Sequence, residues 1–235
     1  SPEYSAAFRH MKGELAKLRE QYDVPPAPDL REGKTLFPPW PEFGTFEIGE
    51  STKGWTKLFN GKSLEGWHTP KNDSMKVVKG EIHIAADPQV FYLHKKKYTD
   101  FILELEVKTT AKDFDSGVGF RCQLTKGAKL PTGYQSEISD IRSGGIFDIG
   151  VGWMLPANEQ DKIDAFVKTT DSFYQAGKWN QIRVKCEGER IRTWINGQRC
   201  SDYTSSKHQT GMIGLQHNQK DGGVVRFRNL RIRKL

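Results

Sequence analysis

Polar side chains that can do acid–base chemistry alternate with apolar ones along several short segments. In 117–123, Val118, Phe120 and Cys122 have the phase of a core strand, so the residues between them face outward. The same alternation assigns an outward phase in 101–107, 134–138 and 212–217. If these strands share one sheet, the outward residues converge on one face. They are Glu106, Arg121, Gln135, Glu137, Gln216 and, at a strand end, His217.

This combination of side chains suits the recognition and cleavage of a sugar. Planar guanidinium and amide groups can bind pairs of hydroxyls, and a carboxylate can act as a base. Three glycines of the same phase, Gly117, Gly119 and Gly214, would let a ligand approach the backbone. The alternative is an ordinary cross-strand ion pair between Glu106 and Arg121, worth at most about 1 kcal/mol. The alternation alone does not decide between a site and an ion pair.

The elements around these residues are predicted to be almost entirely β-strands. From Trp55 onward the hydrophobic pattern has period two, with turn signals every 8–12 residues, and Asn196-Gly197 is the strongest hairpin signal. Short strands without alternating helices exclude a parallel α/β sheet and predict an all-β, two-sheet sandwich or jelly roll. The stretch 150–178 is too long for a plain connection, so we expect a functional loop there.

The N-terminal part of the chain differs in composition from the rest. Residues 1–22 have an apolar stripe at helical spacing, which predicts an amphipathic helix that docks on another domain or subunit. Residues 23–50 are rich in proline, which predicts an extended linker. The sandwich is expected to occupy 51–235.

Charge, hydropathy and cysteine content exclude several functions. The formal net charge is +7, but the densest basic stretch, 226–234, alternates with apolar residues like the outer face of a strand, which argues against nucleic-acid binding. No apolar run is long enough to span a membrane. The three cysteines lack C-x-x-C spacing and predict neither a zinc site nor a disulfide framework.

Ordered motifs along 54–235 resemble one bacterial family, the 3-keto-disaccharide hydrolase domain, formerly a domain of unknown function. The segment 58–67, LFNGKSLEGW, resembles the opening motif of the family, and 133–138, GYQSEI, resembles its GYE-x-Q-I. Asp115 stands where the family has Asn, and Gln135 and Glu137 reverse the order of the family's Glu and Gln. Further matches are 115–121, 179–180, 196–197, 211–217 and 227–230. Residues 15–22 also resemble the tail of a bacterial sulfatase.

The resemblance implies a concanavalin-like jelly roll in a glycan-degrading bacterium, exported to the periplasm or the cell exterior. It implies action on glycosides whose sugar is oxidised at C3. The polar positions of the family fall on Arg121, Gln135, Glu137, Gln216 and His217, the set that strand phase also selects.

The leading hypothesis is base-assisted elimination followed by hydration. A C3 carbonyl acidifies the C2 proton, so Glu137 or His217 would remove it while Arg121 stabilises the enolate. The amides of Gln135 and Gln216 would bind hydroxyls.

Two alternative functions and one candidate metal ligand accompany this hypothesis. In a classical glycoside hydrolase, Glu137 and Glu106 would form the carboxylate pair. In a non-catalytic carbohydrate-binding module, Trp153 or Tyr134 would stack on a sugar. Asp140 is a candidate ligand for a divalent metal, although turn capping is the preferred explanation for this residue. No cofactor is otherwise indicated.

Overall fold

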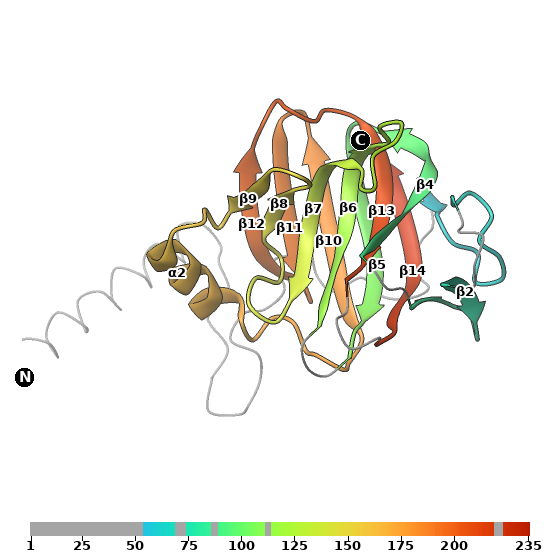
Figure 1. Ribbon diagram of the computed structural model, residues 1–235, viewed down its shortest axis with the longest axis horizontal. Helices are drawn as coiled ribbons and strands as arrows, with labels where there is room; N and C mark the ends of the chain where they lie inside the picture. The colour runs from blue at the N-terminus through green and yellow to red at the C-terminus, as the bar shows by residue number, and fades with distance from the viewer. Residues whose placement is uncertain (1–53, 69–73, 86–88, 111–113, 219–222) are drawn as a thin grey trace, which may run out of the picture. The chain divides into compact units, whose positions relative to one another are not determined.

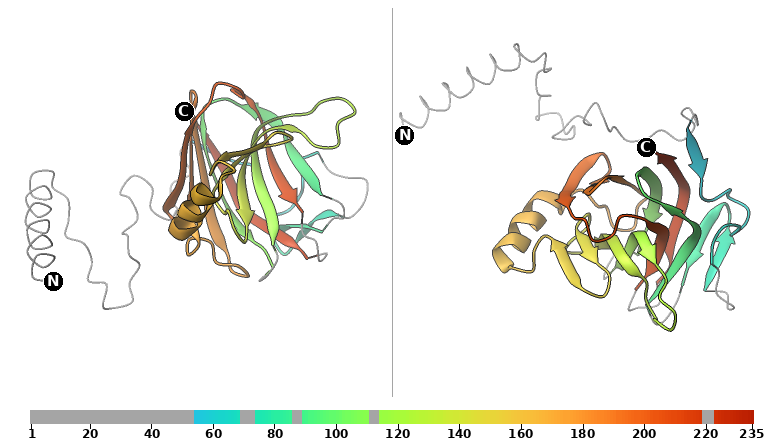
Figure 2. Two further views of the ribbon diagram at one scale, coloured as in Figure 1. Left: turned by 60° about the vertical axis from the view of Figure 1, so that its left-hand side comes forward. Right: turned by 90° about the horizontal axis from the view of Figure 1, so that it is seen from above.

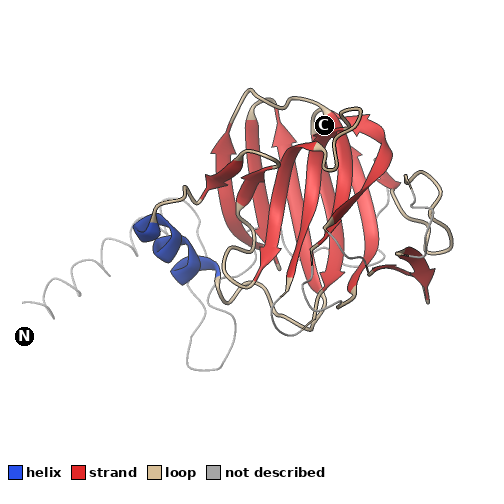
Figure 3. Cartoon of the chain, viewed as in Figure 1, coloured by secondary structure: helices blue, strands red, loops and turns tan. Residues whose placement is uncertain are grey.

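The computed structural model describes residues 54–68, 74–85, 89–110, 114–218 and 223–235 (Figures 1 and 3). The predicted helix at 1–22 and the linker at 23–50 lie outside the described residues. The described part is a sandwich of two antiparallel sheets with a single α-helix, which confirms the expected all-β, two-sheet architecture. Figure 2 shows the two sheets from two further directions.

The smaller sheet has six strands, in the order β4-β13-β6-β7-β8-β9. Four sequence segments were expected to share one sheet. Three of them form the neighbouring strands β13, β6 and β7 of this sheet, and the fourth forms a strand of the larger sheet. The strands are β4 (Val90–Tyr98), β13 (Gly211–His217), β6 (Asp115–Gln123), β7 (Thr132–Ser139), β8 (Ile146–Asp148) and β9 (Gly152–Leu155).

The larger sheet has eight strands, in the order β12-β11-β10-β5-β14-β3-β2, with β1 also paired to β14. The strand that holds Glu106, β5, lies at its centre. The strands are β12 (Gln198–Thr204), β11 (Arg190–Ile195), β10 (Asn180–Glu187), β5 (Phe101–Lys108), β14 (Val225–Lys234), β3 (Glu81–Ile84), β2 (Met75–Val78) and β1 (Trp55–Lys57).

The inner faces of both sheets are filled by alternate residues of their strands. Leu105 and Val184 from the larger sheet, and Val118, Ile138 and Leu215 from the smaller one, are fully buried. They belong to one continuous hydrophobic cluster between the sheets. The strand alternation seen in the sequence therefore reflects one face toward the core between the sheets and one outer face.

The stretch 150–178, which the sequence predicted to be a functional loop, contains regular structure. It contains β9 and the helix α2 (Gln160–Thr170), which leads into the segment before β10. Only Ile163, Phe166 and Val167 give α2 an apolar stripe, and most of the helix is exposed. So short a stripe in a polar run is a weak helix signal.

Among the described residues, the helix is too short and too polar to cross a membrane.

Candidate functional site

The outer face of the smaller sheet holds the candidate site, and β7 supplies its central residues. Tyr134, Ser136 and Ile138 point into the sandwich, so Gln135 and Glu137 lie on the outer face. The Gln135 amide nitrogen donates to Glu137 Oε2 at 2.7 Å. The strand therefore holds an amide and a carboxylate in direct contact, on the face that the alternation predicted for both.

The neighbouring strand β13 adds a third polar group to this pair. The Gln135 amide nitrogen also donates to Gln216 Oε1 at 3.1 Å. Gln216 pairs with Gly117 of β6, and Gly117 pairs with Glu137, so the three strands align in register. Three of the residues that the sequence assigned to one face thus form a hydrogen-bonded cluster, which we call the Gln-Glu cluster: Gln135, Glu137 and Gln216.

Gly117 is a glycine because the cluster crosses directly over its backbone. A Cβ at this position would lie 2.3 Å from the Gln135 side-chain carbonyl carbon. Gly119 is the next residue of β6 on the same face, and it pairs with Gln135 and with Gly214. A Cβ on Gly119 would lie 2.9 Å from the Cys122 sulfur. The glycines make room for side chains that lie flat on the sheet.

An aromatic and cationic wall borders the cluster on the β8–β9 side. Gln135 pairs with Phe147, which pairs with Trp153, so both rings have the phase of Gln135. The rings pack edge to face at 5.2 Å, and the Arg142 guanidinium lies 4.3 Å from the Trp153 ring centre. Arg142 Nε and Nη1 are buried and have no hydrogen-bond partner among the described residues. Half-exposed Trp153 is thus placed where a sugar ring could stack.

The opposite end of this face is apolar. Leu93, Cys122, Ile149 and Met212 form a small buried cluster separate from the main core, with Phe91 packed against it. Phe91 pairs with Gln216, so the apolar patch continues directly from the Gln-Glu cluster. The outer face therefore changes from polar to apolar along its strands.

Glu137 has an unusual proton affinity for a carboxylate. Burial raises its pKa to about 8, and the negative charge of Asp115 adds to the rise, while Gln135, Ser139 and Arg142 oppose it. Asp115 is a diagonal neighbour, because it pairs with Ser139 two residues beyond Glu137. Asn218 donates to Asp115 Oδ2 at 2.6 Å. Two carboxylates thus lie on one face, and the charge of Asp115 makes Glu137 harder to ionise.

Arg121 does not join this site, contrary to the prediction. The sheet has a bulge there, with a register shift in both neighbouring pairings and a φ of 51° at Arg121. The side chain is fully buried and donates to the carbonyl oxygens of Thr99, His208 and Gly188. Its role is to tie the end of β6 to the turns of both sheets. The bulge also moves Cys122 from the predicted core phase to the outer face.

Glu106 lies in the other sheet, so the predicted Glu137–Glu106 carboxylate pair does not exist. Arg228 Nε donates to Glu106 Oε2 at 2.8 Å, and the Asn229 amide donates to the same oxygen. Phase alone could not assign β5 to a sheet. Glu106 is in an ion pair, as the alternative interpretation proposed, but its partner is Arg228 rather than Arg121.

His217 and Tyr134 both point away from the outer face. His217 directly follows Gln216, so its side chain has the opposite phase, and it is fully buried. Its Nε2 donates to the Gly223 carbonyl oxygen at 2.7 Å. Tyr134 is fully buried and donates its hydroxyl to Ser205 Oγ at 2.6 Å. The predicted roles of His217 as base and Tyr134 as stacking platform therefore lack access to a ligand on this face.

Asp140 lies beyond the end of β7, on the wall of a pocket of about 180 Å³. The described residues contain no group of three or more His, Cys, Asp or Glu side chains placed to hold a metal. Asp140 and Asp171 are the acidic residues of this pocket. The metal role of Asp140 remains a prediction.

Sequence reasoning did not assign Arg142, Phe147 or Asp115 to the site. Arg142 lies in the turn after β7, where strand phase gives no information. Phe147 belongs to a strand of three residues, too short for a clear alternation. Asp115 starts β6 and stands two residues before Gly117, so its outward phase was readable from the same alternation that placed Gly117.

Comparisons with known proteins now bear on this geometry. Residues 54–233 match the family described as 3-keto-alpha-glucoside-1,2-lyase-like domain. The chain belongs to this family. No curated protein matches the sequence.

Several solved structures share the fold of this chain at low sequence identity. Two proteins from Parabacteroides distasonis ATCC 8503, each described as a candidate glycosyl hydrolase, align with TM-scores of 0.59 and 0.58. Their identities are 18% and 22%, over 82% and 77% of this chain and 99% of each of those chains. The exoplasmic/lumenal domain of VIP36, in a form bound to Ca²⁺ and Man3GlcNAc, aligns with a TM-score of 0.51 at 9% identity, over 79% of this chain and 90% of that one. Family and fold together indicate a glycosyl hydrolase-like or carbohydrate-binding jelly-roll protein.

Proposed function

We propose that this protein cleaves glycosides whose sugar carries a carbonyl at C3, on the outer face of the smaller sheet, with Glu137 as the base. The observation that supports this most is the environment of Glu137. A buried carboxylate with a pKa of about 8 is a far stronger base than an exposed one. The family description, which names a lyase of 3-keto glucosides, points to the same chemistry.

The cleavage needs one base and one group that stabilises an oxyanion. Glu137 takes the C2 proton, and the electron pair of the C2–H bond moves to form an enolate across C2 and C3. When the C3 carbonyl forms again, a C1–C2 double bond appears, the C1–O bond breaks, and the leaving oxygen takes the proton from Glu137. Addition of water across the C1–C2 bond then gives net hydrolysis.

Arg142 takes the role that the sequence assigned to Arg121. Its guanidinium acts electrostatically on Glu137, and two of its nitrogens have no partner among the described residues. Buried donors without partners are costly unless a ligand satisfies them. We place the enolate oxygen of the substrate against them, with the sugar ring on Trp153 and hydroxyls on Gln135 and Gln216.

The test compares a 3-keto glucoside with its unoxidised parent. Release of the aglycone is followed for the wild-type protein, for Glu137→Gln and for Glu106→Gln. We expect cleavage of the keto form alone, a loss of at least about 10²-fold in kcat in Glu137→Gln, and retained activity in Glu106→Gln. Glu106→Gln is the matched control because it makes the same change in a glutamate of the other sheet.

Other results would support different functions. Cleavage of the parent glycoside would indicate classical hydrolysis. Binding of the sugar without cleavage, unchanged in Glu137→Gln, would indicate a carbohydrate-binding module. Full activity of Glu137→Gln on the keto form would exclude Glu137 as the base.

A further inference from the structure

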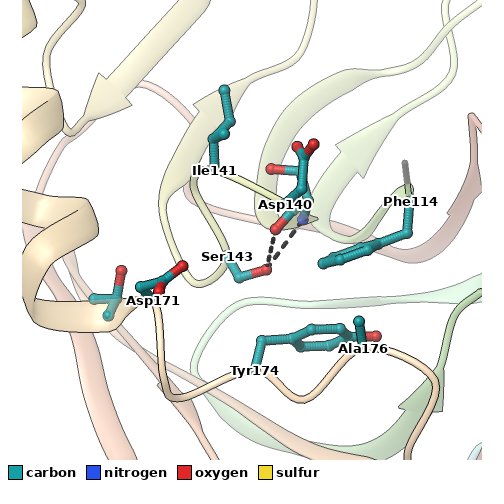
Figure 4. A pocket seen from close by; sticks show the side chains of 9 residues that line it. Phe114, Asp140, Ile141, Ser143, Asp171, Tyr174 and Ala176 are labelled. Carbon is teal, nitrogen blue, oxygen red and sulfur yellow. Dashed lines mark hydrogen bonds between the residues drawn. The ribbon is translucent and has the colours of Figure 1, made fainter. Parts of the chain in front are cut away.

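A pocket of about 180 Å³ lies at the end of β7, where its lining begins with Ser139, two residues beyond Glu137. Figure 4 shows the side chains that line it. Ser139 lines it and also hydrogen-bonds to Glu137. Phe114, on another wall, directly precedes Asp115. The pocket and the proposed base are therefore neighbours through two separate strands, β6 and β7.

The walls of the pocket combine aromatic rings with hydroxyl groups. The rings of Phe114 and Tyr174 stack at 5.0 Å with an angle of 26° between their planes. Ser143 Oγ donates to the Ser139 carbonyl oxygen at 2.6 Å, which holds the turn after β7 against this wall (Figure 4). At about 30 Å³ per water, the volume corresponds to roughly six water molecules, the scale of one small ring.

Two carboxylates give the pocket its charge. Asp140 belongs to the turn after β7, and Asp171 directly follows α2. Both side chains are exposed, and neither forms an ion pair in the part of the chain that the structure describes, although the protein as a whole is basic. Unpaired carboxylates accept hydroxyl hydrogen bonds and repel anions.

We infer that this pocket is the subsite for the leaving group of the glycoside, and that Asp140 and Asp171 select a neutral hydroxylated ring against an acidic one. The inference rests on the proposed function, because it places the departing ring beside Glu137. It also gives the segment between β9 and β10 a role, since Thr170, Asp171, Tyr174 and Ala176 all line the pocket.

The kinetic test uses two 3-keto glucosides that differ only in the leaving ring, one glucose and the other glucuronic acid. For the wild-type protein we expect kcat/KM to be about tenfold or more higher with the neutral ring. In Asp171→Asn and Asp140→Asn this ratio should fall at least threefold, mainly through a lower KM for the glucuronide. Asp161→Asn is the matched control, because it removes the same charge from α2 outside the pocket.

A binding test separates failure of this inference from failure of the proposed function. Glucose and glucuronate are titrated into Glu137→Gln, and amide shifts of 139–143 and 170–176 are followed by NMR. Shifts in these segments with glucose and weaker ones with glucuronate support the subsite, even if no keto glycoside is cleaved. Equal ratios in wild type and both Asp variants, or sugar-induced shifts confined to other segments, would overturn it.

Discussion

Gln135 lies across the backbone of Gly117 and donates from one amide nitrogen to both Glu137 and Gln216, at 2.7 and 3.1 Å. Its own carbonyl oxygen is buried and has no partner in the described part of the chain. The amide therefore fixes the orientation of the Glu137 carboxylate while keeping one acceptor for a ligand hydroxyl. The positions of Gly117, Gln135 and Glu137 on the adjacent strands β6 and β7 therefore depend on one another.

The first prediction concerns the stability of Glu137→Gln as a function of pH. The pKa of Glu137 is about 8 in the folded protein and near the ordinary glutamate value of 4.5 in the unfolded chain. The folded state thus holds a proton that the unfolded state releases, so stability falls as pH rises from about 4.5 to about 8. Gln has no charge to bury. The variant should therefore be more stable than wild type above pH 8, by an amount on the order of a few kcal/mol.

Thermal unfolding of both proteins at pH 5 and pH 9 measures this effect. A gain of 1 kcal/mol raises Tm by about 2–4 °C in a protein of this size. The difference between the proteins should grow from pH 5 to pH 9. A constant difference would show that Glu137 titrates in its ordinary range.

The second prediction is that Gly117→Ala is harmful because of Gln135. A Cβ at residue 117 would come within 2.3 Å of the Gln135 side chain, so the amide has to leave its place between Glu137 and Gln216. We expect a loss of about 1–3 kcal/mol in unfolding free energy and a fall in kcat.

A double-mutant cycle checks the cause. Gln135→Ala removes the atoms that clash, so Gly117→Ala should cost much less in that background. Additive losses of stability in the double variant would mean that the alanine acts through the backbone of β6.

The third prediction separates two arginines: Arg121, which the sequence assigned to the site, and Arg142, which it did not. Arg142→Lys should lower kcat at least about tenfold with little change in stability, since the guanidinium donates only one long side-chain hydrogen bond among the described residues and a lysine can still place a cation near Trp153. Arg121→Lys should instead lower the unfolding free energy by about 3 kcal/mol or more, because a buried network to Thr99, Asp100, His208 and Gly188 is broken. Denaturant unfolding and steady-state kinetics on both variants distinguish the two roles.

What the sequence could predict depends on whether a residue lies in a regular strand. In β7 and β13 the alternation is uninterrupted around Gln135, Glu137 and Gln216, and the structure brings these side chains together. In β6 the bulge at Arg121 inverts the phase of the last residues, and nothing local in the sequence marks it. Glu106 has the right phase but lies in the larger sheet, because pairing between distant strands is not encoded in any one segment. The sequence did not reveal Arg142, because residues in a turn have no periodic pattern that shows which way their side chains point.

The last prediction is the pH dependence of cleavage and its shift in Asp115→Asn. Glu137 must be ionised to remove the C2 proton, so log(kcat/KM) should rise with pH up to about 8 and then level off. The charge of Asp115 is one cause of the raised pKa, and removing it makes ionisation of Glu137 easier. The midpoint in Asp115→Asn should therefore move to lower pH while the plateau rate decreases, since a weaker base removes the proton more slowly. Rates measured from pH 5 to 10 on both proteins give the two midpoints. An unchanged midpoint in Asp115→Asn would assign the ionisation to another group. The control is Asp202→Asn, which removes a carboxylate paired with Arg190 in the other sheet and should leave the pH profile unaltered.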